Sequence, residues 1–390
     1  MGEVSPVPPT GSVQSGSPTL LIGSCEAFSG KSALVLGLAR QLLQRGLAVR
    51  FGKPLAAGDA LAGGDGPASD STADALIPEE ALIDEDVRFV GRTLSLPQEQ
   101  LIPAVHCHSS ATSRQRLLGG ELQAADGLAA LRERLATAPE GLTLLEGPGS
   151  LSEGLLYGLS LVQVARGLQA PVVLVHPWSD CDSIDPLLLA REQLGDLLAG
   201  VVLNGVEPER LDGLREDLVP ALERLGLPVL GVMPRSPLLR SVTVEELSRR
   251  LDAQVLCCRD RLDLLVETLS IGAMNVNSAM EFFRRRRNMA VVTGADRTDI
   301  QLAALEASTQ CLILTGAGEP LPQLISRAEE LEVPLLKVEH DTLTTVEVIE
   351  RTFGHVRLQE SVKATYAFRL VEEHCNFEAL FQRLRLPVAV

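Results

Sequence analysis

An apolar run, a turn of small residues and the triplet Gly-Lys-Ser follow one another near the start of this chain, and together they constrain its fold strongly. Residues 20–22 have the composition of a buried strand, and residues 33–43 have the apolar periodicity of a helix. A turn between a buried strand and a helix binds phosphate oxygens through its backbone N–H groups and the helix N-terminus. The sequence therefore predicts a phosphate-binding loop within an α/β fold.

The spacing of this loop is a loosened form of the usual motif. That motif has a glycine, four residues and then Gly-Lys-Ser or Gly-Lys-Thr, which would place the first glycine at Cys25, whereas the glycine of this chain is Gly23. If the loop binds a nucleotide, we expect Lys31 to reach the terminal phosphates and Ser32 to ligate Mg²⁺. The alternative is a plain helix N-terminus with an exposed lysine.

The charge balance of the chain argues against a nucleic-acid or an anionic membrane partner. The formal net charge is −16 over 390 residues, and such surfaces are bound through clustered Lys and Arg. The basic run at residues 284–287 is typical of a solvated helix face. No window approaches about 18 uninterrupted apolar residues, and residues 1–18 are rich in Ser, Pro and Gly. We expect a soluble cytoplasmic protein with a disordered leader over residues 1–18.

The seven cysteines are scattered without the spacing of a metal site, and their odd number indicates reduced thiols. The tripeptide His106-Cys107-His108 could suggest a metal site. Neighbouring residues of an extended segment point to opposite faces, however, which favours a loop. Cys25 lies inside the predicted phosphate turn, and we expect it to be unusually reactive because a helix N-terminus lowers the pKa of a thiol.

Strand-like apolar runs alternate with helix-length segments between residues 19 and 235, which we predict to form the first domain. The expected strands are residues 19–22, 48–53, 142–146, 172–176, 200–204 and 229–232, and the expected helices include residues 158–167, 185–194 and 211–225. Such alternation predicts right-handed βαβ crossovers and a mainly parallel sheet flanked by helices. Ligands of such sheets bind at the carboxyl ends of the strands.

Polar residues stand at three of these strand ends. Lys53 ends the second strand, Glu146 ends the third and Asn204 ends the fifth. Glu146 can hold Mg²⁺, Lys53 can neutralise a transferred phosphoryl group or an acidic substrate, and Asn204 can hydrogen-bond a base. Each also has a plain alternative, because strands often end in such residues where they emerge into water.

A polar segment, residues 58–74, is predicted to form a mobile loop over the nucleotide site. Asp70 and Asp74 lie at its end, and the acidic trio Asp84-Glu85-Asp86 follows. One of these carboxylates could serve the metal. The alternative is that the acids are simply solvated, as is common for an acidic cluster in an acidic protein.

Several parts of the first domain form one pattern: residues 24–32, Lys53-Pro54, Glu146-Gly147, Asn204 and residues 231–234. At matching intervals over about 215 residues, this pattern resembles the dethiobiotin synthetase type of P-loop ATPase. The resemblance implies ATP and Mg²⁺ as ligands and phosphorylation of a carboxylate or carbamate. It implies nucleotide binding by Ser24, Glu26, Ser29, Gly30, Lys31, Ser32 and Asn204, metal binding by Ser32 and Glu146, and catalysis by Lys31 and Lys53.

The chain departs from that family at two positions. Phe28 stands where the family usually has an acidic residue, and Ala57 stands where it usually has a serine that helps to hold the substrate. The resemblance therefore concerns the scaffold and the nucleotide site more firmly than the substrate.

The composition changes after residue 235. Residues 236–252 are expected to form a charged connector, and residues 253–355 a smaller α/β domain. Its expected strands are residues 254–257, 289–293, 311–315 and 334–338, its expected helices are residues 277–287, 299–307 and 321–331, and residues 262–269 are either helix or strand.

The turn at residues 293–299 lies between a strand and a helix of this second domain. It contains Asp296-Arg297-Thr298 and resembles the motif of the DRTGG domain, although Asp299 and Ile300 replace the two glycines. The resemblance implies a second ligand at Asp296, Arg297 and Thr298. The plain alternative is that Asp296 or Thr298 caps the helix.

The order of the two domains resembles the N-terminal half of long phosphate acetyltransferases, in which a further domain performs acetyl transfer. Residues 356–390 are too few for such a domain, so acetyltransferase activity is not expected. This tail has apolar positions such as Phe368, Leu370 and Phe377, and we expect it to pack onto a domain or onto another subunit.

Three functions from different classes stay open at this point. The first is a regulatory or sensor protein that binds ATP and Mg²⁺ in its first domain, a second ligand in its DRTGG-like domain, and a protein partner. The second is an ATP-dependent ligase that activates a carboxylate with Lys31, Ser32, Lys53 and Glu146. The third is an assembly protein whose P-loop has lost its nucleotide. The resemblance to dimeric dethiobiotin synthetases implies a homo-oligomer.

Overall fold

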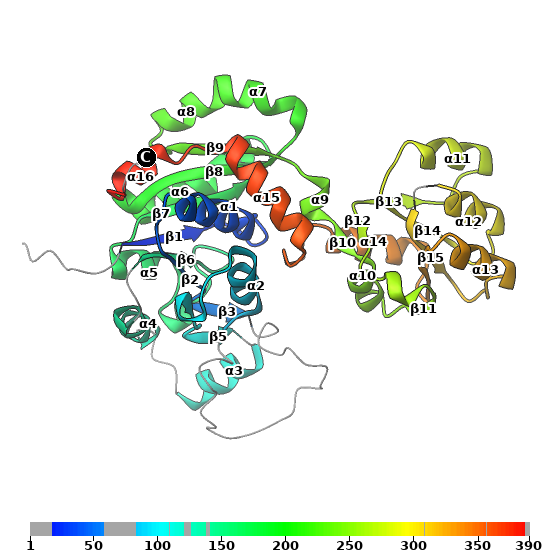
Figure 1. Ribbon diagram of the computed structural model, residues 1–390, viewed down its shortest axis with the longest axis horizontal. Helices are drawn as coiled ribbons and strands as arrows, with labels where there is room; N and C mark the ends of the chain where they lie inside the picture. Colours follow the sequence, from blue (N-terminus) through cyan, green and yellow to red (C-terminus); the bar gives the residue numbers. More distant parts are fainter. Residues whose placement is uncertain are drawn as a thin grey trace, which may run out of the picture. The chain divides into compact units, whose positions relative to one another are not determined.

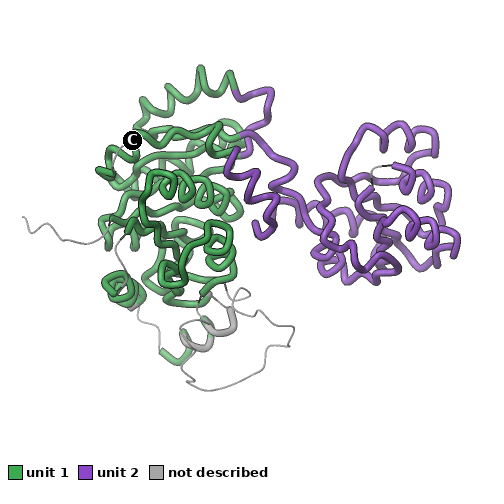
Figure 2. The backbone as a smooth tube through the Cα atoms, in the orientation of Figure 1, with its two compact units in different colours: residues 1–204, 212–233, 370–390 green, residues 205–211, 234–369 purple. Residues whose placement is uncertain are grey.

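The computed structural model describes residues 18–57, 83–108, 110–120, 126–137, 141–307, 309–355 and 357–386. The chain forms two compact units (Figure 2). Unit 1 comprises Met1–Asn204, Asp212–Met233 and Leu370–Val390, and unit 2 comprises Gly205–Leu211 and Pro234–Arg369. Each unit is therefore assembled from separate stretches of the sequence.

Unit 1 is built on a seven-stranded sheet in the order β4-β2-β6-β1-β7-β8-β9 (Figure 1). Its strands are β1 (Thr19–Gly23), β2 (Val49–Gly52), β4 (Leu101–Ile102), β6 (Leu142–Glu146), β7 (Val172–Pro177), β8 (Leu198–Val206) and β9 (Val229–Pro234). The pairs β1/β6, β1/β7, β2/β4, β2/β6 and β7/β8 are all parallel. The predicted mainly parallel sheet is confirmed, and its apolar runs suit strands that helices cover.

Helices flank this sheet, and α1 carries the phosphate loop at its N-terminus (Figure 1). The helices are α1 (Lys31–Gln44), α2 (Glu85–Leu94), α3 (Ser110–Gly119), α4 (Asp126–Thr137), α5 (Leu161–Leu168), α6 (Ile184–Leu194), α7 (Leu211–Gly213), α8 (Val219–Arg224) and α16 (Glu378–Arg383). A short parallel pair joins β3 (Leu55–Ala57) to β5 (His106–His108). Residues 33–39 of α1 are all buried, so this helix is covered on most of its sides and not along a single stripe.

The C-terminal segment completes unit 1. Helix α15 (Ser361–His374) begins in unit 2 and ends in unit 1. Its end lies against α1, because a Cβ added at Gly37 would come within 2.3 Å of the Cβ of Val371. Leu370, Phe377 and Leu380 are buried as well. Of the two alternatives for the tail, the structure therefore shows the one in which it packs onto a domain.

Unit 2 is built on a five-stranded sheet in the order β11-β16-β15-β14-β13. Its strands are β11 (Gln254–Cys257), β13 (Thr268–Ile271), β14 (Met289–Gly294), β15 (Thr309–Thr315) and β16 (Leu335–Val338). The edge strand β11 is antiparallel to β16, whereas β13, β14, β15 and β16 run parallel. Residues 262–269, for which helix and strand were both open, include β12 (Leu265–Val266) and the start of β13.

Two apolar clusters cover the two faces of this second sheet, because successive side chains of a strand point to opposite faces. One cluster joins Val291 and Leu312 to α11 (Val276–Arg284), α12 (Thr298–Leu305) and α13 (Pro322–Glu330). The other joins Val292 and Ile313 to α10 (Val244–Arg250) and α14 (Thr342–Thr352).

The segment expected to be a connector, residues 236–252, is part of unit 2 instead. It forms α9 (Pro237–Arg240), β10 (Val242–Thr243) and α10, and β10 pairs antiparallel with β12. Val242, Val244 and Leu247 are fully buried in the second apolar cluster. The charged residues of this stretch suggest an exposed connector. Its apolar face is buried against the second sheet, however, and this burial makes the segment part of the domain.

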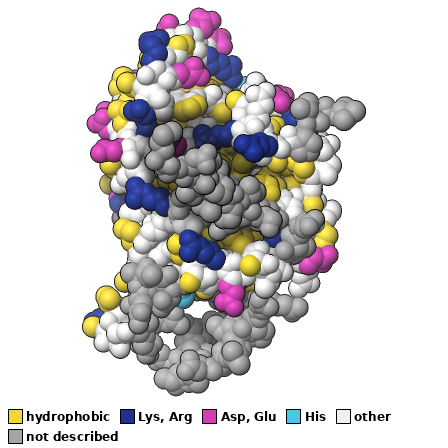
Figure 3. All heavy atoms as spheres, turned by 90° about the vertical axis from the view of Figure 1, so that its left-hand side faces the viewer, with side chains coloured by type: hydrophobic (Ala, Val, Ile, Leu, Met, Phe, Trp, Pro, Cys, Tyr) yellow, Lys and Arg dark blue, Asp and Glu magenta, His cyan; other side chains and the backbone are white. Residues whose placement is uncertain are grey.

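Two predictions, the disordered leader and the mobile loop at residues 58–74 with Asp70 and Asp74, fall largely or wholly outside the described residues. Within the described ranges, no helix is long and apolar enough to cross a membrane. On the face shown in Figure 3, basic and acidic side chains are interspersed with apolar and neutral ones.

Candidate functional site

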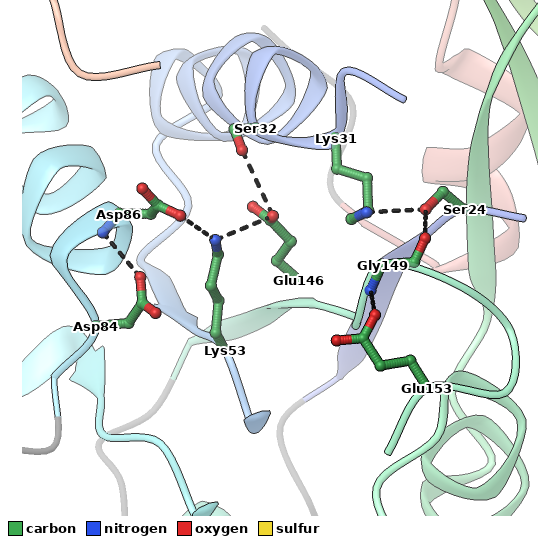
Figure 4. A network of polar contacts seen from close by, with 9 residues as sticks. All are labelled: Ser24, Lys31, Ser32, Lys53, Asp84, Asp86, Glu146, Gly149 and Glu153. Atoms are coloured by element: carbon green, nitrogen blue, oxygen red, sulfur yellow. Dashed lines mark hydrogen bonds and ion pairs between the residues drawn. The ribbon is translucent and has the colours of Figure 1, made fainter. Parts of the chain in front are cut away.

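The register of the unit 1 sheet brings the predicted strand-end residues to one edge. Ile22 of β1 pairs with Glu146, and Gly52, which precedes Lys53, pairs with Leu145. The C-terminal ends of β1, β2 and β6 are therefore adjacent. Figure 4 shows the result, in which Ser32 and Lys53 both point toward Glu146.

The turn before α1 requires glycine at one position. Gly30 has φ +98°, and a Cβ there would lie 2.3 Å from Nδ2 of Asn204, so both the backbone conformation and the space exclude a side chain. The Asn204 Nδ2 donates to the carbonyl oxygen of Ser29 at 2.8 Å. Asn204 therefore fixes the loop, while its predicted contact with a base stays a prediction.

Lys31 faces the interior of the site. Only 8% of it is exposed, and its Nζ donates to Ser24 Oγ at 2.8 Å, while Ser24 Oγ donates to the Gly149 carbonyl at 3.1 Å. Glu153 Oε2 accepts from the backbone N–H of Gly149 at 2.7 Å (Figure 4). The alternative of an exposed lysine is wrong for this turn.

The pKa of Lys31 is lowered, and burial is the main cause. The charge of Glu146 acts against this shift, the charge of Lys53 adds to it, and the charge of Glu153 opposes it. A ligand with negative charge would favour the ammonium form that burial disfavours. The buried ammonium is thus suited to a polyanion.

A second group of charges surrounds Lys53. Its Nζ contacts Asp86 Oδ2 and lies 3.2 Å from Glu146 Oε1, and Ser32 Oγ lies 3.4 Å from the same Glu146 oxygen. Asp84 caps α2 by accepting from the backbone N–H of Asp86 at 2.8 Å. Burial acts to lower the pKa of Lys53, but the carboxylates of Glu146, Asp86 and Asp84 outweigh it, so the pKa is raised.

These residues fit a magnesium ion. Glu146 Oε2 is buried and has no hydrogen-bond partner among the described residues. Mg²⁺ is usually held by one or two carboxylates together with substrate phosphates, and with bonds of about 2.1 Å its neighbouring ligands lie about 3 Å apart. The separation of 3.4 Å between Ser32 Oγ and Glu146 Oε1 is close to that spacing. Ser32, Glu146 and Asp86 would hold the ion.

Asp86 is the residue of this group that sequence reasoning did not single out. It belonged to the acidic trio at residues 84–86, whose three members the prediction treated alike. The available signal was the cap: an aspartate at the N-cap of an amphipathic helix fixes the direction of the next turn. In the structure Asp84 makes that cap and Asp86 faces Lys53.

Two further predictions for this loop concern Glu26 and Cys25. Glu26, named for nucleotide binding, is exposed, whereas Ser24 and Ser29 are buried. The lowered pKa predicted for Cys25 is wrong. Its Sγ lies 3.5 Å from the carbonyl oxygen of Pro186, and burial, with the charge of Glu26, raises the thiol pKa to about 12.

The remaining cysteine predictions concern metals and disulfides. All seven cysteines are free thiols. Within the described part of the chain, no three His, Cys, Asp or Glu side chains converge as a metal-binding cluster.

The DRTGG-like turn of unit 2 lacks the predicted side-chain cap of its helix. Arg297 occupies the N-cap of α12 and makes no side-chain cap, so the expected cap by Asp296 or Thr298 is wrong. The Arg297 Nη2 donates to the Met274 carbonyl at 3.0 Å. The guanidinium therefore ties the turn to the loop before α11, and a ligand at Asp296, Arg297 and Thr298 stays a prediction.

Two family models match successive parts of this chain. The family model of the AAA domain matches residues 18–243, and that of the DRTGG domain matches residues 246–352. Among solved structures, the MinD cell division protein of Aquifex aeolicus matches 57% of this chain and 84% of that chain at 12% identity, with a TM-score of 0.33.

Curated relatives fall into two groups. The phosphate acetyltransferase of Nitratidesulfovibrio vulgaris is 25% identical over an alignment of 390 positions, which covers 94% of this chain and 51% of that protein. The ATP-dependent dethiobiotin synthetase of Pseudomonas aeruginosa is 34% identical over 226 residues, which cover 56% of this chain and 90% of that protein. The chain thus spans about half the length of the phosphate acetyltransferases that it matches. It belongs to the AAA domain family through residues 18–243, where it is also related to the ATP-dependent dethiobiotin synthetases.

Proposed function

We propose that unit 1 binds ATP together with Mg²⁺ and that the chain works as a nucleotide-dependent regulatory or sensor protein. The main support for a nucleotide site is the arrangement of polar side chains at the C-terminal edge of the sheet. Lys31 is buried beside the loop, and one hydroxyl and two carboxylates surround Lys53. ATP is favoured over other nucleotides because the related dethiobiotin synthetases are named as ATP-dependent.

Each part of the site has a role in this proposal. The loop from Ser24 to Ser32 would surround the phosphates with N–H groups, and Lys31 would exchange its bond to Ser24 for one to the terminal phosphates. Ser32, Glu146 and Asp86 would hold Mg²⁺, which when bound neutralises phosphate charge. Asn204 would keep the loop in place beside the base, and Glu26 would lie at the rim.

The regulatory role is supported by what surrounds the nucleotide site. Phe28 and Ala57 replace the polar residues that the resemblance associates with substrate. A second α/β unit with the DRTGG sequence model follows, and its turn at Asp296, Arg297 and Thr298 is the proposed place of a further ligand. The output would be an interaction with a protein partner or a change in a homo-oligomer. A cytoplasmic location suits these ligands.

A second candidate is an ATP-dependent ligase that activates a carboxylate. The 34% identity to a dethiobiotin synthetase over 90% of its length favours this function, as does the position of Lys53 beside the Glu146 carboxylate. In this case Lys53 and Lys31 would be the catalytic cations on a transferred phosphoryl group. The activity that names the phosphate acetyltransferases is not carried over, because the chain covers only 51% of them.

Calorimetry with ATP and Mg²⁺, followed by measurement of ADP release, tests the proposal. We expect saturable binding, and slow turnover that small carboxylic acids do not accelerate. ADP release that depends on such an acid would replace the sensor by the ligase. The absence of binding at millimolar nucleotide would contradict both and leave a structural role for the P-loop unit.

A further inference from the structure

Lysine is rare in this chain, and each lysine has a defined place. The sequence has 4 lysines and 31 arginines. Lys31 bonds to Ser24, Lys337 pairs with Glu319, and Lys363 pairs with Glu360. Lys53 differs from these three because its ammonium contacts two carboxylates, those of Asp86 and Glu146. An ammonium is a compact point charge, unlike the planar guanidinium that the chain uses elsewhere.

The Lys53 ammonium and the proposed metal position share one oxygen atom. Glu146 Oε1 lies 3.2 Å from Lys53 Nζ and 3.4 Å from Ser32 Oγ. Ser32 belongs to the proposed metal position, and Asp86, the second carboxylate of that position, is the other partner of Lys53. In Figure 4 the ammonium lies between the two carboxylates, and Ser32 points from α1 toward the same Glu146 oxygen that Lys53 contacts.

Two cations cannot both be held closely by the same pair of buried carboxylates without repelling each other. The Glu146 side chain is 5% exposed and those of Lys53 and Asp86 are 13% exposed, so water screens this repulsion only weakly. Without a cation the two carboxylates would repel each other in the same poorly solvated place. A cation is therefore needed there for both carboxylates to stay ionised.

We propose that Lys53 is an internal counter-ion that stands in for the divalent cation: its ammonium holds Glu146 and Asp86 together in the metal-free protein and yields them when a divalent cation arrives. This inference rests on the proposed nucleotide site. It adds that either the Lys53 ammonium or a divalent cation contacts the two carboxylates, but not both at once. The released ammonium becomes free to pair with an incoming anion, so the site gains its metal and exposes a cation in one step.

Binding of Mn²⁺ in the absence of nucleotide tests this exchange, because the electron paramagnetic resonance signal of free Mn²⁺ is lost on binding. Lys53→Met removes the internal cation, and we expect Mn²⁺ to bind at least about tenfold more tightly than to the wild type. Lys53→Arg keeps the charge and can bind both carboxylates through its fork, so its Mn²⁺ affinity is expected not to exceed that of the wild type.

Lys31→Met is the matched control, because it removes one positive charge from the same site without removing a carboxylate contact. We expect its Mn²⁺ affinity to stay within about threefold of the wild type. Equal tightening in Lys31→Met and Lys53→Met would overturn the proposal, since net charge alone would explain both. An unchanged affinity in Lys53→Met would overturn it as well.

A measurement on the unmodified chain guards against a variant that fails to fold. Amine acetylation followed by peptide mass spectrometry resolves the four lysines separately. Mn²⁺ should speed the acetylation of Lys53 and leave that of Lys337 unchanged; slower or unchanged labelling of Lys53 contradicts the exchange. Failure of ATP to bind would overturn the proposed function but not this Mn²⁺ comparison, whereas normal ATP binding with unchanged Lys53 behaviour would overturn only the exchange.

Discussion

The turn before α1 and the turn before α12 have the same place in their units, at the C-terminal end of a parallel strand and the start of a helix. They use their cations in opposite ways. Lys31 is 8% exposed. Its site contains the buried oxygen Glu146 Oε2, which has no hydrogen-bond partner among the described residues. Arg297 has a side chain that is 38% exposed, lies near Asp299 and donates to the Met274 carbonyl.

This difference shows that a strand, a turn and a helix are not enough to make a binding site. The side chains around the turn decide whether it can bind a ligand. In unit 1 the surrounding strand ends contribute groups that an anion and a metal can use. In unit 2 the guanidinium of Arg297 donates to a carbonyl of the loop before α11. The predictions below test whether the two turns really differ in this way.

The largest effect is expected for Lys31→Ala. Loss of a charged hydrogen-bond donor to the phosphates should weaken ATP binding by about 10- to 100-fold, the equivalent of about 1.5–3 kcal/mol. Calorimetry compares this variant with Arg297→Ala, the matched change in the other turn, for which the ATP affinity of unit 1 should stay within about twofold. Equal losses in both variants would erase the distinction between the turns.

Acid should destabilise unit 1 through His176. Burial lowers the pKa of this histidine, at the end of β7, from 6.5 to about 4. The unfolded chain therefore binds more protons than the folded chain between these values, so stability is present above pH 6.5 and is lost as the pH falls toward 4. From pH 7 to pH 5 the expected loss is about 2 kcal/mol.

Urea unfolding at the two pH values measures this loss. His176→Gln should reduce the pH dependence, whereas His355→Gln, at an exposed histidine of unit 2, should retain it. Hydrogen exchange should show the acid effect in unit 1 and not in unit 2. A pH dependence that survives His176→Gln unchanged would assign the effect to other groups.

The metal position is tested by Glu146→Gln. This change removes the carboxylate charge next to Ser32, and we expect the Mg²⁺-dependent part of ATP affinity to fall about tenfold. Calorimetry with and without Mg²⁺ separates this part from nucleotide binding alone. A matched change at an exposed carboxylate, Glu306→Gln, should have no such effect. If ATP affinity in Glu146→Gln falls equally with and without Mg²⁺, Glu146 acts on the loop and not on the metal.

The smallest effect is expected for the stability of unit 2 in Arg297→Ala. The side chain makes a hydrogen bond to a carbonyl but is partly exposed, so its loss should lower the free energy of unfolding by about 1 kcal/mol. Chemical denaturation followed by hydrogen exchange in the β14–α12 turn measures this change. A neutral effect would mean that the hydrogen bond from Arg297 to the Met274 carbonyl does not stabilise the turn.

The sequence was a good guide where local pattern and site chemistry coincide. Apolar runs predicted the strands of both sheets except β4 and β13, and the parallel sheet then placed Lys53 and Glu146 at one edge. Asp86 could not be identified, because its partner Lys53 lies before a long polar segment and three neighbouring acids were equivalent. The lowered pKa predicted for Cys25 was wrong because the fold buries the thiol, which the local sequence does not reveal. Residues 236–252 were misassigned as a connector because burial of their apolar face outweighs their local charge.

The docking of Val371 beside Gly37 has a consequence for how the chain is made. The helix that carries Lys31 is synthesised before unit 2, whereas the segment that covers part of it follows the Pro234–Arg369 stretch of unit 2. During translation the nucleotide unit must therefore wait, with part of its apolar surface open, until all of unit 2 has emerged.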